Sequence, residues 1–221
     1  MSYFLLTRLA RLLTLVLLGH RFFQLRGLDG VPRSGPLLIV SNHVGAVDPA
    51  LIGAWAPRAV WFMAKSELFR GFFTRRLMIA YHAFPVVRHS ADRKALRRAI
   101  DLLRAGQAVV LFPEGHRSDD GRLQRAQPGA GFLARHSGAP LVALGITGTE
   151  RVLQRHHRLP GRAPVRMTFG PPFHIPERNP DGSPMNHQQT ADYLMTKIAQ
   201  LLPLEVQGPY HHEGPPASEA V

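Results

Sequence analysis

The chain has 221 residues, 45% of them hydrophobic and none of them cysteine, and its 27 Lys and Arg against 15 Asp and Glu give a formal net charge of +12. These numbers fit one folded domain and exclude a largely disordered chain, a disulfide framework, a thiolate metal site and a thiol nucleophile, with a reducing cytosolic setting as the simplest interpretation. The charge either serves solubility or indicates an anionic partner such as nucleic acid, an anionic membrane or a phosphorylated substrate, and the predominance of Arg favours bidentate binding of phosphate or carboxylate.

Residues 1–27 predict an amphipathic helix that anchors the chain to a membrane surface. Leucine and valine recur there at helical spacing, interrupted by Arg8 and Arg11, as in a helix that lies in the lipid interface. The uninterrupted apolar run at 12–19 is shorter than the roughly 20 residues that cross a bilayer. Residues 20–23 lack the small side chains of a secretory cleavage site. A buried core helix is the other interpretation of this pattern.

Residues 28–203 predict an α/β domain with a central mixed, mostly parallel sheet flanked by helices. After a turn-rich connector, the expected strands cover residues 37–40, 59–63, 84–87, 108–112, 141–146 and 165–169. The expected helices cover residues 91–105, 129–136 and 186–202. The first of these has Ser90 as its cap, Gly106 as its end and a buried side made of Leu96, Ala99, Ile100 and Leu103. Residues 204–221 lose this periodicity and predict a flexible C-terminal tail.

His43 and Asp48 stand five positions apart, where the first apolar strand of the domain ends and a helix should begin. A neutral imidazole titrates near working pH, and a carboxylate on its second nitrogen fixes the tautomer and stabilises the imidazolium. The pair can therefore activate a hydroxyl group. Asp48 followed by Pro49 is also typical of a helix N-cap with proline at the first helical position, so a capping role is the alternative.

Residues 113–118 form a second polar cluster directly after an expected strand. Open α/β sheets bind ligands beyond the carboxyl ends of their strands, so we expect this loop and His43 at one site. Glu114 can accept a hydrogen bond from a hydroxyl, Gly115 allows close approach of the backbone, and Arg117 can bind phosphate in a bidentate manner. Without a shared site, the segment is an ordinary charged turn.

Lys65 and Arg88 each follow an expected strand, so both could point toward the same edge of the sheet. Taken singly, each is better explained as a solvated surface charge. The histidine pairs at 156–157 and 211–212 have no third ligand at a useful spacing. We interpret them as surface residues and predict no metal site.

With these elements in view, the chain resembles the glycerolipid acyltransferases, the family that includes the 1-acyl-glycerol-3-phosphate acyltransferases and their bacterial members. The likeness extends from about residue 35 to about residue 175. It is carried by four blocks, which in family order are Asn42–Asp48, Ala83–Arg88, Phe112–Ser118 and Ala139–Val142. Four blocks in the family's order are far more specific than any one of them.

This resemblance implies transfer of a fatty acyl group from a thioester, on coenzyme A or acyl carrier protein, to the free hydroxyl of lysophosphatidic acid, giving phosphatidic acid in phospholipid biosynthesis. It implies that His43 is the general base, that Asp48 orients it, and that Lys65 helps to stabilise the oxyanion. The positions that would hold the glycerol phosphate of the acceptor are Arg88, Glu114, Gly115 and Arg117.

The resemblance also implies a peripheral or monotopic position on the cytosolic face of the cell membrane. The partners would be the lysophospholipid, the acyl thioester and an anionic membrane surface, with no nucleic acid, no metal, no covalent intermediate and no cofactor beyond the thioester cosubstrate. The family often has other residues at His82, Val87, His116 and Ala143. Three of these positions flank the expected acceptor site, so glycerol-3-phosphate or another lysolipid stays open as the acceptor. A non-catalytic basic module on membrane or nucleic acid is the alternative of another class, although the sequence has no recognisable nucleic-acid motif.

Overall fold

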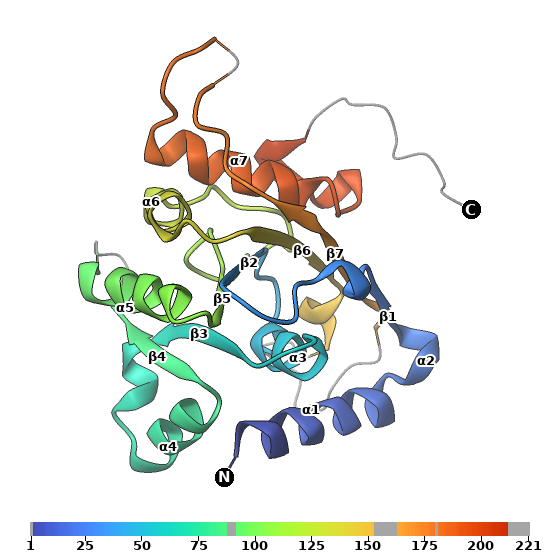
Figure 1. Ribbon diagram of the computed structural model, residues 1–221. Coiled ribbons are helices and arrows are strands. Elements are labelled where there is room, and N and C mark those ends of the chain that lie inside the picture. The colour runs from blue at the N-terminus through green and yellow to red at the C-terminus, as the bar shows by residue number, and fades with distance from the viewer. Residues whose placement is uncertain (1, 88–91, 153–162, 180, 212–221) are drawn as a thin grey trace.

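The computed structural model describes residues 2–87, 92–152, 163–179 and 181–211, which form a sheet between two layers of helices (Figure 1). The helices are α1 (Tyr3–Leu17), α2 (Gly19–Phe22), α3 (Asp48–Trp55), α4 (Phe72–Ala80), α5 (Arg93–Arg104), α6 (Pro128–Ser137) and α7 (His187–Ala199). The strands are β1 (Phe23–Arg26), β2 (Leu37–Ser41), β3 (Val60–Lys65), β4 (Ala83–Val86), β5 (Ala108–Leu111), β6 (Leu141–Thr147) and β7 (Val165–Phe173).

The strands form one sheet in the order β1-β7-β6-β2-β5-β3-β4. Neighbouring strands are parallel in every pair except β6 with β7. This arrangement confirms the expected mixed, mostly parallel sheet flanked by helices. β2 lies in the middle of the sheet and residues 37–40 are 0% exposed, which explains why this strand is a continuous apolar run instead of an alternating one.

Two apolar cores lie on opposite faces of the sheet. α5, α6 and α7 pack on one face, around a core that includes Leu103, Leu133 and Leu194. α1, α3 and α4 lie on the other face, over a core that includes Ile52 and Phe62 (Figure 1). Because helices cover both faces, a ligand can reach the sheet only at its edges or at the ends of its strands.

All six expected strands are present, whereas β1 and α4 were not expected. β1 has only four residues, and its side chains alternate between half-buried and exposed at the end of the sheet. α4 contains no buried residue, and most of its apolar side chains are exposed, so it lacks the buried face of a packed helix. β7 extends to Phe173, beyond the expected end at residue 169, where it pairs with the start of β6.

The ends of α5 follow from local hydrogen bonds. Asp92 accepts the backbone N–H of Ala95 at 3.0 Å, while the expected cap, Ser90, lies outside the described residues. Gly106 has a φ of +75° and donates its N–H to the carbonyl of Leu103 at 2.8 Å, which ends the helix as expected. The buried side of α5 differs from the expectation at two positions, where Ala95 and Leu102 are buried in place of Leu96 and Ile100. It consists of Ala95, Ala99, Leu102 and Leu103, while Leu96 and Ile100 are only partly buried.

An N-terminal helix is present as expected, but α1 ends at Leu17 instead of residue 27, because residues 23–26 pair with β7 as strand β1. Tyr3, Thr7 and Thr14 are the buried residues of α1, which packs on α3. Most of its leucines face outward, with Leu12 58% exposed and Val16 67% exposed. A core helix would bury these side chains, so the core interpretation is wrong. Within the described ranges, none of the helices is both long enough and apolar enough to cross a membrane.

The chain stays packed beyond the expected domain boundary at residue 203. Residues 204–206 and 208–210 form two short 3-10 turns, and Gln207 is buried between them. The Gln207 side chain donates to the carbonyls of Ala199 and Leu202, each at 2.9 Å. These contacts belong to the domain, and residues 212–221 lie outside the described part of the chain.

Tyr210 fastens this C-terminal segment, and replacing it with phenylalanine should therefore destabilise the fold. Its hydroxyl donates to Asp192 at 2.8 Å and accepts the backbone N–H of Ala126 at 3.0 Å. Tyr210→Phe should lower the free energy of unfolding by about 1–2 kcal/mol, because it leaves a partly buried N–H without a partner. Urea denaturation measures this loss. Tyr193→Phe is the matched control, since in the described ranges that hydroxyl makes no hydrogen bond, and equal losses in the two variants would contradict the assignment.

Candidate active site

The carboxyl ends of three parallel strands bring the expected site residues to one edge of the sheet. His43 comes shortly after β2, Glu114 shortly after β5, and Lys65 is the last residue of β3. β2 and β5 are neighbours, and β3 lies on the far side of β5. The loops that follow β2 and β5 therefore meet at the position where open α/β sheets bind ligands.

Asp48 binds the imidazole of His43 instead of capping α3. The Nδ1 atom of His43 lies 2.7 Å from Asp48 Oδ2, and the same oxygen accepts the backbone N–H groups of Val44 and Gly45, each at 2.8 Å. The N-cap position of α3 is Val47, whose side chain makes no capping hydrogen bond. The capping interpretation of Asp48 is therefore wrong, because its carboxylate turns back toward the end of β2.

The surroundings of Asp48 fix the tautomer of His43. Asp48 is fully buried and accepts three further hydrogen bonds, so its carboxylate has no proton to offer and Nδ1 of the imidazole must donate. In the neutral ring this leaves Nε2 as an acceptor. The His43 side chain is 10% exposed, and across the described ranges its Nε2 accepts no hydrogen bond. Such a nitrogen can take a proton from a hydroxyl group that reaches it.

Thr149 completes the surroundings of Asp48, and sequence reasoning missed it. Its hydroxyl donates to Asp48 Oδ1 at 2.5 Å, and the residue is fully buried. Gly45 makes room for it, because a Cβ at that position would lie 2.6 Å from Thr149 Oγ1. Thr149 is 101 positions from Asp48 along the chain, and it belongs to none of the motifs, so no signal in the sequence pairs the two residues.

Asn42 anchors the residue before His43 to the neighbouring strand. Its amide nitrogen donates to the carbonyl of Ile146 and its amide oxygen accepts the N–H of Ile146, both at 2.8 Å. Ile146 belongs to β6, so the Asn42 side chain continues the β2–β6 ladder for one more pair of hydrogen bonds. The sequence places Asn42 inside a motif, but a buried polar residue at the end of an apolar strand is the only hint of this role.

The 113–118 loop is bonded to the backbone of His43 on both sides. The N–H of His43 donates to Glu114 Oε1 at 3.0 Å, and the carbonyl of His43 accepts the N–H of Ser118 at 2.8 Å. The ring of His43 also stacks on Phe112, with centroids 4.2 Å apart. The imidazole and the loop therefore form one rigid unit, and Arg117 lies one residue from the Ser118 contact.

Glu114 supports this unit from inside. The sequence suggested contact with a ligand, but the Glu114 side chain is fully buried, and its Oε2 atom accepts the N–H of Gln124 at 3.0 Å. Burial raises the pKa of Glu114 to about 7, opposed by the N–H bonds from His43 and Gln124 and assisted by the charges of Asp48 and Asp120. Because both oxygens already have partners, this geometry fits a positioning role better than direct contact with a ligand.

Gly115 and Arg117 are the members of the loop that remain accessible. Gly115 is exposed and has a φ of +76°, a left-handed conformation that suits glycine, so its backbone is open to close approach. Arg117 is half-buried, and its guanidinium pairs with none of the carboxylates that the structure describes. A half-buried guanidinium without a carboxylate partner is suited to binding an anion.

Lys65 lies at the same edge but is not joined to His43. It is exposed and forms an ion pair with Glu67, with 3.4 Å between Nζ and the carboxylate. Neither a hydrogen bond nor an ion pair links it to His43 among the described contacts. Arg88 lies outside the described residues.

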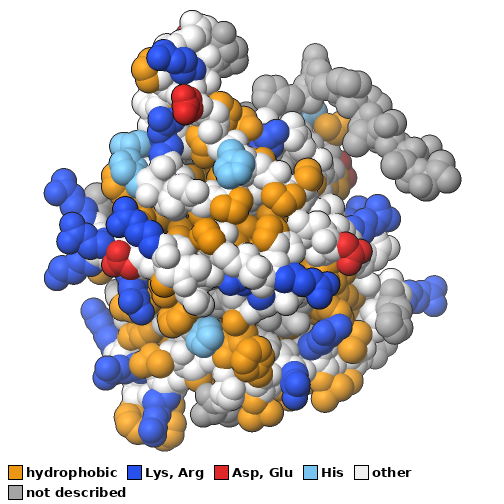
Figure 2. Space-filling model, in the orientation of Figure 1, with side chains coloured by type: hydrophobic (Ala, Val, Ile, Leu, Met, Phe, Trp, Pro, Cys, Tyr) orange, Lys and Arg blue, Asp and Glu red, His pale blue; other side chains and the backbone are white. Residues whose placement is uncertain are grey.

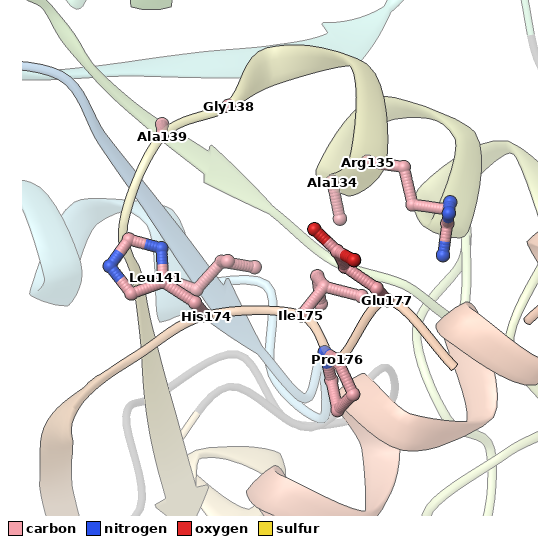
Figure 3. Close-up of a pocket in the computed structure, with 9 residues that line it drawn as sticks. All are labelled: Ala134, Arg135, Gly138, Ala139, Leu141, His174, Ile175, Pro176 and Glu177. Atoms are coloured by element: carbon pink, nitrogen blue, oxygen red, sulfur yellow. The ribbon is translucent and has the colours of Figure 1, made fainter. Parts of the chain in front are cut away.

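Two hollows of the described surface are separate from His43. A pocket of about 190 Å³ opens beside Leu141, the first residue of β6, with His174 and Glu177 in its wall (Figure 3). Leu141 lies at the amino end of its strand, whereas His43 follows the carboxyl end of the parallel strand β2, so the pocket is at the opposite end of the sheet. The pocket volume is below the roughly 300 Å³ at which ligand sites begin. A groove of about 1050 Å³ lies between α5 and α6, on one face of the sheet. Among the described residues, no three His, Asp or Glu side chains are grouped closely enough to hold a metal ion, and the pair at 156–157 lies outside them.

Comparisons with known proteins point to one family. The model of a family described as Acyltransferase matches residues 22–147. A 1-acyl-sn-glycerol-3-phosphate acyltransferase of Bacillus subtilis (strain 168) is 30% identical over 148 residues, which are 66% of this chain and 71% of that protein. An enzyme of the same name from Pseudomonas aeruginosa is 23% identical over 204 residues, which are 90% of this chain and 77% of that protein.

Plant relatives are longer, and one solved structure has the same fold. A chloroplastic 1-acyl-sn-glycerol-3-phosphate acyltransferase of Brassica napus is 30% identical over 59% of this chain, but the match spans only 38% of the plant protein. The crystal structure of the 1-acyl-sn-glycerophosphate acyltransferase PlsC from Thermotoga maritima superposes with a TM-score of 0.70, at 20% identity over 89% of this chain and 76% of that one. At this identity the superposition supports the fold alone.

The raised pKa of Glu114 predicts a specific dependence of stability on pH. The folded protein holds the Glu114 proton up to a pH of about 7, whereas the unfolded chain releases it near its ordinary value of 4.5. The folded state therefore binds more protons between these values, and the free energy of unfolding should fall as the pH rises through this window and level off above it. The loss should be on the order of 3 kcal/mol.

Glu114→Gln removes this titration, so the stability of the wild type relative to the variant should decrease between about pH 4.5 and pH 7. Urea denaturation of both proteins at several pH values measures the difference. Glu177→Gln, at an exposed carboxyl, serves as the control and should leave the pH profile unchanged. A wild-type-to-variant difference that stays constant across the range would contradict the raised pKa.

Proposed function

The chain belongs to the acyltransferase family, and we propose that it transfers a fatty acyl group from an acyl thioester to the free hydroxyl of 1-acyl-sn-glycerol-3-phosphate, giving phosphatidic acid. The observation that carries this proposal is the convergence on His43 of two loops from neighbouring strands. One loop supplies Asp48 to the imidazole, and the other bonds to the backbone of His43 and carries Arg117 one residue from that contact. A base, and an arginine on the loop that is bonded to the backbone of that base, match an acceptor that carries both a hydroxyl and a phosphate. Both bacterial relatives are named 1-acyl-sn-glycerol-3-phosphate acyltransferases, which supports this acceptor.

In the proposed reaction, His43 acts as a general base and then as a general acid. Its Nε2 takes the proton of the acceptor hydroxyl while the hydroxyl oxygen attacks the carbonyl carbon of the thioester. The tetrahedral intermediate collapses, the carbon–sulfur bond breaks, and the imidazolium returns the proton to the departing thiolate. Asp48 holds the ring in the required tautomer and stabilises the imidazolium between the two steps.

The remaining residues hold the acceptor and the developing charge. Arg117 binds the phosphate of the acceptor, and the exposed backbone at Gly115 allows the glycerol to approach. Glu114 acts through His43 and the loop, as a positioning residue. Lys65 could stabilise the oxyanion after exchanging its ion pair with Glu67 for the intermediate. The role expected of Arg88, a second contact to the phosphate, stays part of the proposal.

We also propose that α1 holds the enzyme on an anionic membrane, on the cytosolic face. The support is its outward surface, where leucines and Val16 are exposed beside Arg8 and Arg11. The acceptor is itself a membrane lipid, so an enzyme bound at the surface meets it where it is concentrated. As proposed, the reaction uses no metal and no cofactor beyond the thioester, whose carrier is coenzyme A or acyl carrier protein.

His43→Ala should lower the rate of acyl transfer by about 10²- to 10⁴-fold, because general acid–base catalysis is lost. The assay combines vesicles, lysophosphatidic acid and an acyl thioester, and it is run separately with each carrier. His174→Ala is the matched control, since it removes an imidazole at the opposite edge of the sheet (Figure 3). Turnover retained by His43→Ala would rule out this residue as the base.

Arg117→Ala should raise the KM for lysophosphatidic acid about 10- to 100-fold, with a much smaller change in kcat and in the KM for the thioester, because a charged hydrogen bond to the phosphate is lost. Arg122→Ala, at an exposed position of the same connection, removes an equal charge and is the control. A monoacylglycerol acceptor, which lacks the phosphate, should be acylated equally by wild type and Arg117→Ala. An unchanged KM for lysophosphatidic acid would remove Arg117 from the phosphate site.

A further inference from the structure

A second apolar surface lies on α4, outside the proposed site. We define the α4 face as the exposed apolar side chains of α4 and of the turn before it. Phe72 is 65% exposed and Phe73 is 83% exposed, although phenylalanine is ordinarily among the most buried residues. No residue of α4 is buried. The α4 face consists of Leu68, Phe72, Phe73, Leu77 and Ile79.

The charged residues within 68–80 are all arginines, and the acidic residue that precedes them, Glu67, is paired with Lys65. Arg70, Arg75 and Arg76 lie in or next to α4, and residues 68–80 contain neither Asp nor Glu. The guanidinium of Arg76 lies 5.0 Å from the centre of the Phe72 ring. In the described ranges these three arginines form no ion pair. An anionic surface can therefore pair with all three without displacing another partner.

The C-terminal end of α4 contacts the start of α1. The ring of Tyr3, at the start of α1, lies 5.7 Å from that of Tyr81 and stacks at 4.3 Å on His82, and both residues directly follow α4. Figure 1 places α1 and α4 along the same lower side of the molecule, and Figure 2 shows hydrophobic and basic side chains gathered along that side. The first acidic residue of the chain is Asp29, so α1 and α4 share one composition, apolar with arginines only.

We propose that the α4 face is a second lipid-binding surface, which inserts Phe72 and Phe73 among acyl chains and sets the flanking arginines at the level of anionic headgroups. Aromatic tips and arginine are the residue types that occupy the membrane interface. A protein partner or a second copy would have to supply carboxylates for the arginines, whereas an anionic bilayer supplies phosphates over its whole surface. The inference takes the membrane from the proposed function but does not depend on the chemistry at His43.

Membrane contact through both α1 and α4 has effects that contact through α1 alone does not have. A single amphipathic anchor binds reversibly and leaves the domain free to turn about the helix axis, whereas a second contact strengthens binding and fixes a plane. α4 begins seven residues after Lys65, so Phe72 and Phe73 lie on the end of α4 nearer the carboxyl ends of the strands. Insertion of these rings brings the edge that holds His43 toward the lipid.

Tryptophan fluorescence tests the contact directly. In Phe73→Trp, binding to phosphatidylcholine–phosphatidylglycerol vesicles should shift the added emission to the blue, and brominated acyl chains should quench it. Leu204→Trp is the matched control, because Leu204 is 58% exposed but lies beyond α7, on the other face of the sheet. The wild-type signal of Trp55 and Trp61 is subtracted. Emission from Phe73→Trp that is neither shifted nor quenched on bound vesicles would overturn the proposal.

Two further variants separate the apolar and the charged parts. Phe72→Ser with Phe73→Ser should weaken vesicle partitioning about tenfold or more, with anionic and with neutral lipid. Arg70→Gln with Arg75→Gln should weaken it about tenfold on anionic vesicles only, and this effect should disappear at high salt. Unchanged partitioning of both double variants would overturn the proposal. So would a concentration-dependent dimer in vesicle-free solution that Phe72→Ser with Phe73→Ser abolishes, since the α4 face would then bind a second copy.

Activity distinguishes this inference from the proposed function. Phe72→Ser with Phe73→Ser should acylate a dispersed short-chain lysophosphatidic acid at the wild-type rate and lose activity on vesicles in proportion to its weaker binding. If the wild type acylates no acceptor, the proposed function fails, while the fluorescence and partitioning results still decide whether the α4 face binds lipid. Equal losses on dispersed and vesicle acceptors would show that the phenylalanines serve the fold or the site, and would overturn the inference.

Discussion

The buried carboxylate of Asp48 is the point on which the site depends. An ionised group without exposure is costly unless its oxygens are fully bonded, and here the imidazole of His43, the backbone of Val44 and Gly45, and the hydroxyl of Thr149 provide four donors. The same bonds tie the turn after β2 to the start of α3 and to the 3-10 turn after β6. Stability and the orientation of the imidazole therefore rest on one set of contacts, so a change that disturbs one disturbs the other.

The rest of the site follows from the position of β2 at the centre of the sheet. Because β2 has a parallel neighbour on each side, the residues after it can bond to loops from both. Asn42 reaches β6, while the backbone of His43 reaches the loop after β5. The backbone that carries the imidazole is thereby bonded both to β6 and to the loop after β5, which is the preorganisation that the proposed proton transfer requires.

The sequence predicted the parts of this arrangement that are local or periodic. Apolar runs located the strands, and the spacing of His43 and Asp48 at the end of one of them located the pair, because both depend on neighbours along the chain. Thr149 could not be found in this way, since its contact with Asp48 spans 101 positions. The burial of Glu114 was also hidden, because a charged residue between proline and glycine resembles an exposed turn until the tertiary contacts of His43 and Gln124 enclose it.

α1 packs against the domain and still leaves most of its leucines exposed on its outer side. The side that faces the domain carries Thr7 and Thr14, whose hydroxyls donate to the carbonyls of Phe4 and Ala10 within the helix. Their polar groups are satisfied internally, so burying them costs little, and small side chains let α1 lie close on α3. The leucines can therefore face outward. Their exposure to water costs free energy, and contact with lipid would remove this cost. A helix that depended on its leucines for packing could not leave them exposed, and this division of residues supports the proposal that the membrane lies on the side of α1 and α4.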